Sequence, residues 1–203
     1  LSTEYQKVIG AMTVTFDGQE KTLPQMGVYQ ESTDRDEREN AWTLVTERRL
    51  KDAEQISGIF DQMITKRDQM ARNAGFEDYV GYTFKGMRRF DYTPELCFAF
   101  HSAIEKHVMP FVGRLDERRR SQLGLAALRP WDLSVDPKGR GPLRPFDGGV
   151  DLVSKTQRVF DRMSPELAGM FETLGDGSNS SGADGGASLD LDSRMGKAPG
   201  GYQ

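Results

Sequence analysis

The side chains that could do chemistry are few and widely spaced. Two histidines, His101 and His107, stand six residues apart in a segment with helical periodicity. That spacing turns the second ring by about 240° around the helix axis, so the two rings do not share a face as an i, i+4 zinc pair would. The spacing therefore favours two separate helical histidines over a metal-binding pair.

The single cysteine and a pair of aspartates give no stronger signal. Cys97 lies among the core positions of the same expected helix, which indicates a buried thiol rather than a nucleophile. Asp190 and Asp192 share one face of an expected strand, but no further oxygen ligands follow at the spacing of a calcium loop. The sequence therefore predicts no catalytic and no metal-ligating residue in this chain.

The stretch GKAPGGYQ, residues 196–203, is the candidate for a binding edge. It lacks the spacing and the Lys-Ser/Thr end of a phosphate loop. Gly200 and Gly201 would instead let another backbone approach closely, as a peptide does when it adds to a strand edge. We expect Gly200, Gly201 and Tyr202 to border a peptide substrate, with Lys197 attracting acidic groups. The alternatives are a tight turn without a ligand and a solvent-facing Lys197.

The elements that would position this edge are mainly helical. Residues 12–16 and 19–23 predict a hairpin around an Asp17-Gly18 turn. Residues 34–74, with Asp34 and Glu37 as a capping pair, predict one helix of about 60 Å. Its apolar stripe is expected to be buried against other helices. The stripe, apolar at all positions but two, consists of Trp42, Val45, Arg49, Ala53, Ile56, Phe60, Met63, Arg67 and Met70.

A second long helix is expected to begin at Thr93, an N-cap residue followed by Pro94. Pro110 should kink it. Its buried face is expected at Leu96, Cys97, Phe100, Ile104, Val108, Phe111 and Leu115. Residues 128–145, with four prolines and two glycines, then predict an ordered loop in which Trp131 and Leu133 are buried.

The chain divides into four expected parts. Residues 1–30 contain the hairpin, and residues 31–174 form a helical body that ends in two helices from residue 150 onward. Residues 175–188 predict a flexible Gly/Ser loop, and residues 189–203 a short strand that forms the edge of a cleft. The predicted fold class is mainly α: an elongated helical lobe with a small N-terminal hairpin and a short C-terminal cleft-edge strand.

Composition limits the partners. The net charge is −4 across 203 residues, so the chain lacks the excess of basic residues that is typical of a nucleic-acid-binding protein. No apolar run approaches the roughly 18 residues of a membrane span, and no charged-then-apolar leader opens the chain. A single cysteine fits a reducing compartment. We therefore expect a cytoplasmic protein without nucleic-acid or membrane partners.

Several segments resemble the oligoendopeptidase F branch of the thimet oligopeptidase family of zinc metallopeptidases. The most specific are RPWDL in the loop after the second long helix and DLDSRMGKAPGGYQ at residues 190–203. The other matching segments are residues 5–25, 39–54, 71–84 and 90–110. The resemblance follows the chain in order over nearly its whole length.

The resemblance implies an elongated zincin-type peptidase lobe beside a deep channel that admits oligopeptides. In this family a His-Glu-x-x-His helix and a later glutamate bind zinc, and the motif glutamate activates the attacking water. This sequence contains neither, so the resemblance implies zinc in the complete enzyme and none held by this chain alone. A second chain carrying the zinc-binding half is one alternative.

The expected function is therefore part of a zinc-dependent oligoendopeptidase that hydrolyses peptide bonds in short peptides. This chain would supply the helical wall and the edge of the substrate cleft. The alternative is a non-catalytic helical module that binds peptides or protein partners.

Overall fold

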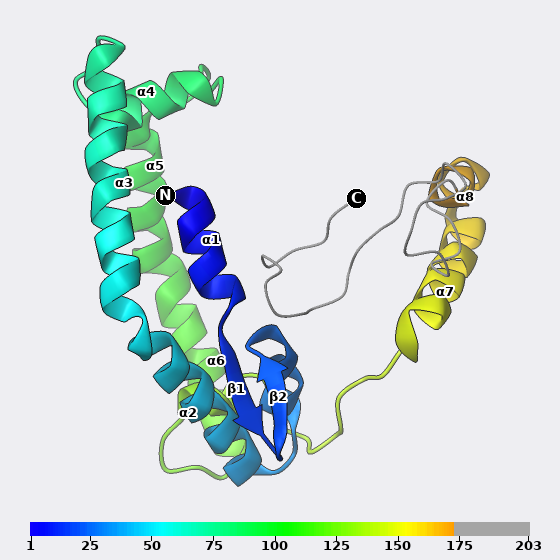
Figure 1. The fold of residues 1–203 in the computed structure, drawn as a ribbon. Coiled ribbons are helices and arrows are strands. Elements are labelled where there is room, and N and C mark those ends of the chain that lie inside the picture. Colours follow the sequence, from blue (N-terminus) through cyan, green and yellow to red (C-terminus); the bar gives the residue numbers. More distant parts are fainter. Residues whose placement is uncertain (173–203) are drawn as a thin grey trace.

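The computed structural model describes residues 1–172 of the 203-residue chain. This part is built of helices with one two-stranded hairpin, as the predicted mainly α class requires (Figure 1). The expected Gly/Ser loop at 175–188 and the expected cleft-edge strand at 189–203 lie outside the described residues.

The predicted N-terminal hairpin is confirmed. Strands β1 (Thr13–Phe16) and β2 (Gln19–Thr22) pair antiparallel, with Phe16 opposite Gln19 at the turn. Asp17 and Gly18 have φ values of 50° and 72°, the left-handed conformation that a two-residue turn of this kind needs. A helix that was not predicted, α1 (Ser2–Gly10), precedes the hairpin, and a 3-10 helix, η1 (Pro24–Glu31), follows it.

The main hydrophobic core lies between the hairpin, η1 and the start of the long helices. Phe16 is 4% exposed, and its ring contacts that of Tyr29 with the centroids 4.4 Å apart. The buried members of this core are Met12, Val14, Phe16, Leu23, Met26 and Ala41. Val45 and Ile56, both from the predicted stripe, pack against it.

The predicted 40-residue helix is two helices, α2 (Arg35–Lys51) and α3 (Ala53–Asn73). Asp52 interrupts them with φ −105° and ψ 8°, and its carboxylate pairs with Arg48 at 2.5 Å. Aspartate is a poor residue for a helix interior, and the N–H of Asp52 donates to the Arg49 carbonyl at 3.3 Å, an i→i−3 bond that ends α2. Asp34 caps α2 as predicted, because its Oδ1 accepts from the Asp36 N–H at 2.9 Å. The N–H of Asp34 itself donates to Ser32 Oγ rather than to Glu37.

The second long helix also carries an interruption. A short helix α4 (Tyr79–Gly86) leads to α5 (Pro94–Ala103), whose first turn Thr93 caps through Leu96 N–H at 3.4 Å. A π-helical turn, η2 (Ile104–Val108), then connects α5 to α6 (Met109–Gln122). Pro110 has no N–H to donate to the preceding turn, so the distortion predicted there takes the form of this π-helical turn.

The remaining described helices form a separate lobe. Helices α7 (Gly148–Met163) and α8 (Pro165–Glu172) pack on each other, with Phe160 and Phe171 ring centroids 5.2 Å apart. A stretch without helix or strand joins them to the rest of the described chain (Figure 1). The two helices expected from residue 150 onward are therefore confirmed.

Candidate functional site

The substrate residues predicted from the sequence belong to the C-terminal segment. Lys197, Gly200, Gly201 and Tyr202 all lie outside the described residues, so their role stays a prediction. What the structure does describe is the helical body that was expected to stand beside them.

The residues with the most reactive side chains are spread along one helical arm. His101 on α5 and His107 on η2 are exposed, and the His101 ring meets Phe98 edge-on at 6.2 Å. Cys97 is half-buried rather than in a core. Within residues 1–172, no group of three or more His, Cys, Asp or Glu side chains is arranged to hold a metal ion. The zinc that the resemblance implies therefore has no ligand set in this part of the chain.

Most of the apolar face predicted on the second long helix, and part of the stripe on α3, are exposed, which corrects the prediction that both are buried. Along α5, η2 and α6, Phe100 is 65% exposed, and Leu96, Val108, Phe111 and Leu115 are also open to solvent. On α3, Phe60 is 54% exposed and Met70 is exposed as well. Trp42 is half-buried. Periodicity identifies which face of a helix is apolar, but it does not show whether a neighbouring element covers that face.

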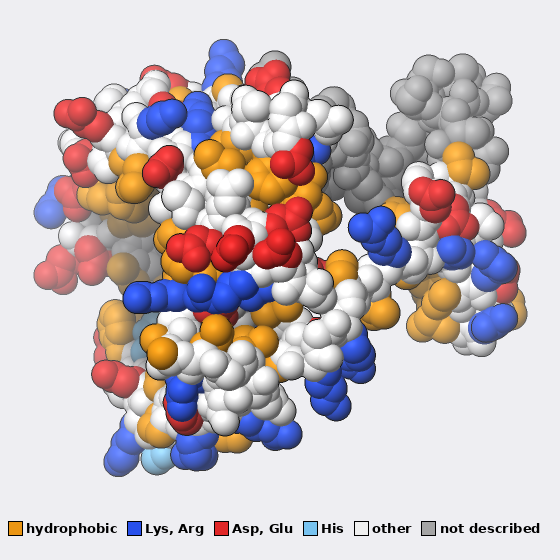
Figure 2. All heavy atoms as spheres, turned by 90° about the horizontal axis from the view of Figure 1, so that it is seen from below, with side chains coloured by type: hydrophobic (Ala, Val, Ile, Leu, Met, Phe, Trp, Pro, Cys, Tyr) orange, Lys and Arg blue, Asp and Glu red, His pale blue; other side chains and the backbone are white. Residues whose placement is uncertain are grey.

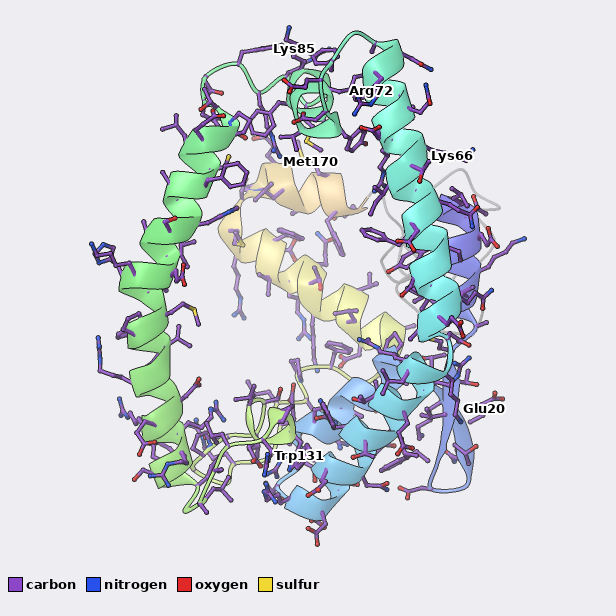
Figure 3. All side chains as sticks on the ribbon, turned by 90° about the vertical axis from the view of Figure 1, so that its left-hand side faces the viewer. Glu20, Lys66, Arg72, Lys85, Trp131 and Met170 are labelled. Atoms are coloured by element: carbon purple, nitrogen blue, oxygen red, sulfur yellow. The ribbon has the colours of Figure 1, made fainter. Side chains whose placement is uncertain are left out.

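Figure 3 shows why these faces are open. Helix α3 and the α5–η2–α6 helix lie on opposite sides of the view, with α4 at one end and α2 with Trp131 at the other. Neither α5 nor α6 packs extensively on α3 within the described part of the chain. The view from below likewise shows hydrophobic side chains among the charged ones at the surface (Figure 2).

The most heavily bonded group of the described residues is Asp132, at the end of the short 3-10 helix η3 (Pro130–Asp132). Its carboxylate is fully buried. Arg35 donates to both oxygens, Nε to Oδ1 and Nη2 to Oδ2, each at 3.0 Å. Arg38 Nη2 donates to Oδ1 at 3.2 Å, and the N–H of Arg129 donates to Oδ2 at 2.9 Å. A buried carboxylate held by two guanidinium groups in this way is a strong and directional contact.

Further bonds tie the same loop to helices on both sides; we call residues 129–136 the clasp loop. Arg38, 3% exposed, also donates from Nε to the carbonyl of Trp131 at 2.8 Å. From α6, Arg119 Nη1 donates to the carbonyl of Val135 at 2.6 Å and to that of Asp132 at 3.2 Å. The clasp loop is therefore bonded to α2 through Asp132 and Trp131, and to α6 through its carbonyls.

The clasp loop was predicted as an ordered loop, but its buried residues were not. Trp131 is half-buried against Trp42, with ring centroids 5.3 Å apart, and Leu133 is exposed. The residues that are buried are Asp132 and Val135. The sequence signal that could have found Asp132 is an acidic residue inside an ordered, proline-rich loop, combined with arginines at the start of α2 and the end of α6.

A cavity of about 250 Å³ lies beside the clasp loop. Its lining comes from the start of α2, the end of α6 and the clasp loop with the residues after it, and includes Thr33, Gln122, Leu123 and Pro137. Arg35 and Arg38 also line it, but both form ion pairs with Asp132. The positive charges of these two arginines are therefore already paired and not free for a ligand in the cavity.

Asp132 should make stability depend on pH in acid. Burial raises the pKa of its carboxyl group, but hydrogen bonds from Arg35, the Arg129 N–H and Arg38 outweigh burial and hold the pKa below its ordinary 3.8. Because the pKa is lower in the folded chain, the stabilisation is complete above the unfolded value and is lost as pH falls through the folded value.

We therefore expect the difference in free energy of unfolding between the native chain and the Asp132→Asn variant to depend on pH. It should be constant above the ordinary aspartate pKa of 3.8 and should shrink below it. Urea titrations across this range measure the difference. A difference in free energy of unfolding that does not change with pH would contradict the lowered pKa of Asp132 in the folded chain.

None of the helices in residues 1–172 is long and apolar enough to cross a bilayer.

Comparisons with known proteins agree with this architecture. The sequence model of peptidase family M3 matches residues 28–140, more than half of the chain. No curated protein sequence matches. Among solved structures, PZ peptidase A with an inhibitor is 28% identical, with a TM-score of 0.86 over 99% of this chain and 34% of its own.

Two structures of candidate oligoendopeptidase F proteins are also similar. One is 25% identical, with a TM-score of 0.87 over 99% of this chain and 34% of its own. The other, from Bacillus anthracis str. Ames, is 24% identical and shows a likeness of fold, with a TM-score of 0.86 over 99% of this chain and 35% of its own. The chain therefore spans about a third of the length of each of these solved structures.

Proposed function

Because this chain belongs to peptidase family M3, we propose that it is part of a zinc-dependent oligoendopeptidase that hydrolyses peptide bonds in short peptides. The observation that carries the proposal is the family match through α2, α3, α5 and α6, together with a likeness to PZ peptidase A over nearly the whole chain. The single cysteine supports a cytoplasmic location as part of the same proposal.

In this proposal the chain contributes structure rather than reactive groups. The two long helical arms supply the wall beside which an oligopeptide lies, and residues 189–203 supply the edge of the cleft. Gly200, Gly201 and Tyr202 border the peptide and offer it backbone hydrogen bonds, while Lys197 attracts acidic groups. Zinc is held by a His-Glu-x-x-His helix on the same polypeptide or on a second chain.

The test compares the 203-residue chain alone with the chain joined to, or mixed with, a polypeptide that carries a His-Glu-x-x-His helix of this family. Zinc is measured by mass spectrometry, and hydrolysis with a quenched fluorescent peptide. We expect neither zinc nor turnover with the chain alone, and both with the combination. One tightly bound zinc per isolated chain would overturn this division of roles.

A Gly200→Val variant in the active combination tests the cleft edge. A β-branched side chain at this position should block the close approach of the peptide backbone, so turnover should fall while the zinc content stays unchanged. Gly58→Val on α3 is the matched control, because a side chain there meets open space. Equal turnover of the Gly200→Val variant and the control would contradict the proposal that Gly200 borders the substrate.

The exposed apolar face of α5 and α6 favours a second candidate, a non-catalytic module that binds peptides or proteins. The same experiment separates the two functions. A combined sample that binds zinc and the peptide but never cleaves it would support the binding module.

A further inference from the structure

The two helical arms of the fold are joined at their ends. The first arm is α2 with α3, and the second is α5, η2 and α6; Figure 3 shows α3 and the second arm on opposite sides. At one end α4 connects them. Arg67 of α3 lies over the ring of Tyr79 in α4, 5.7 Å from its centroid. Phe84 of α4 contacts Tyr92, just before α5, with the ring centroids 5.7 Å apart. Between the ends their apolar faces are exposed, so side-chain packing between the arms does not fix how far apart they stand.

At the opposite end, buried polar contacts add to the packing of Trp42 on Trp131. The bonds of Arg35 and Arg38 to Asp132 fasten the clasp loop to the first arm. The bonds of Arg119 to two loop carbonyls fasten the same loop to the second arm. Hydrogen bonds have narrow ranges of distance and angle, so a loop bonded on both sides fixes the position of one arm relative to the other.

We call the bonds of the clasp loop to Arg35, Arg38 and Arg119 the joint. Its central groups are buried, which distinguishes it from an ion pair at the surface. Asp132 is fully buried and Arg38 nearly so, whereas the ion pair of Arg72 with Asp68 on α3 is exposed on both sides. An exposed ion pair contributes little to the free energy of unfolding, because water can replace either partner. A buried carboxylate that loses its partner lowers the free energy of unfolding strongly. The joint therefore resists opening.

We infer that the clasp loop sets the separation of the two helical arms and that Asp132 is the positioning residue in it. A loop that served only as a local anchor would need bonds to one helix, whereas this loop is bonded to both arms. The inference concerns the arrangement of the arms and does not depend on the proposed peptidase activity.

The test measures the distance between the arms in the 203-residue chain. In a Cys97→Ser background, spin labels are placed at exposed positions on each arm by Lys66→Cys on α3 and Ser102→Cys on α5. Double electron–electron resonance gives the distance distribution, and circular dichroism gives the helix content. We expect one narrow distribution in the native background and a broader one, shifted to longer distances, with Asp132→Asn at unchanged helix content.

Asp136→Asn is the matched control within the clasp loop. The Asp136 carboxylate binds the N–H of Lys138 and the side chain of Arg140, both on its own segment, so its loss should leave the distribution narrow. If Asp132→Asn does not fold, Arg35→Lys provides a milder change that removes the two-bond contact and keeps Arg38 in place. It should broaden the distribution at unchanged helix content.

Three results would overturn the inference. One is an unchanged distribution with Asp132→Asn. Another is equal broadening with Asp136→Asn. The third is loss of helix with Asp132→Asn while Arg35→Lys leaves the distances unchanged, which would restrict the clasp loop to a role in stability.

Discussion

Replacing Arg38 with alanine is expected to lower the free energy of unfolding by about 3–5 kcal/mol. The guanidinium of Arg38 is buried and bonds to the Asp132 carboxylate and to the carbonyls of Trp131 and Ser32, each at 3.2 Å or less. Its removal leaves a buried carboxylate with one guanidinium partner and two carbonyls without this donor. Because the groups that remain are buried, they cannot all regain water without opening the joint.

Urea denaturation of the 203-residue chain measures this loss. Arg72→Ala is the matched control, since Arg72 also pairs with an aspartate but on the exposed surface of α3. The control should unfold at nearly the same urea concentration as the native chain. Equal stability of both variants would show that the buried contacts of Arg38 contribute no more than an exposed pair.

The local signals in the sequence predicted local structure well. The Asp17-Gly18 turn predicted the hairpin because few residues adopt two successive left-handed conformations. Asp34 and Thr93 predicted helix starts because their side chains can accept from the first free N–H groups. In each case the stabilising contact lies within a few residues, so the sequence around it contains the necessary information.

Features that depend on distant parts of the chain were not predicted. Arg35 and Asp132 are 97 residues apart, and no periodicity connects them. The break at Asp52 is a local feature, but it was missed because the apolar stripe continues through it and neither a glycine nor a proline marks it. The stripe itself was interpreted as buried along its whole length, although coverage of a helix face depends on elements that the pattern does not describe.

The candidate site was predicted mainly through resemblance. The spacing of the histidines and aspartates, and the position of the single cysteine, indicated no catalytic group. Composition argued against nucleic-acid and membrane partners but did not identify a partner. The segments RPWDL and GKAPGGYQ connected the chain to a peptidase family, and the family match through residues 28–140 confirms that identification. RPWDL also contains Asp132, so a segment noticed for its likeness contains the most heavily bonded carboxylate of the described chain.

Replacing Phe16 with alanine is expected to lower the free energy of unfolding by about 3–5 kcal/mol. The Phe16 ring is 4% exposed and packs in the cluster between the hairpin, η1 and α2, where it contacts Tyr29. Truncation removes the buried ring and leaves a cavity, and both cost stability because the surrounding side chains relax only partly into the space. Thermal and urea unfolding followed by circular dichroism measure the loss.

Phe60→Ala is the matched control because it removes the same side chain from α3. The sequence analysis placed Phe60 in a buried stripe, which would make the two variants equally damaging. The structure leaves Phe60 54% exposed, so its truncation should change the free energy of unfolding by less than about 1 kcal/mol. A loss with Phe60→Ala as large as that with Phe16→Ala would mean that another copy of the chain, or residues beyond 172, cover α3 in solution. A small loss at Phe60 and a large one at Phe16 would locate the core of this chain at the hairpin end of the helical arms.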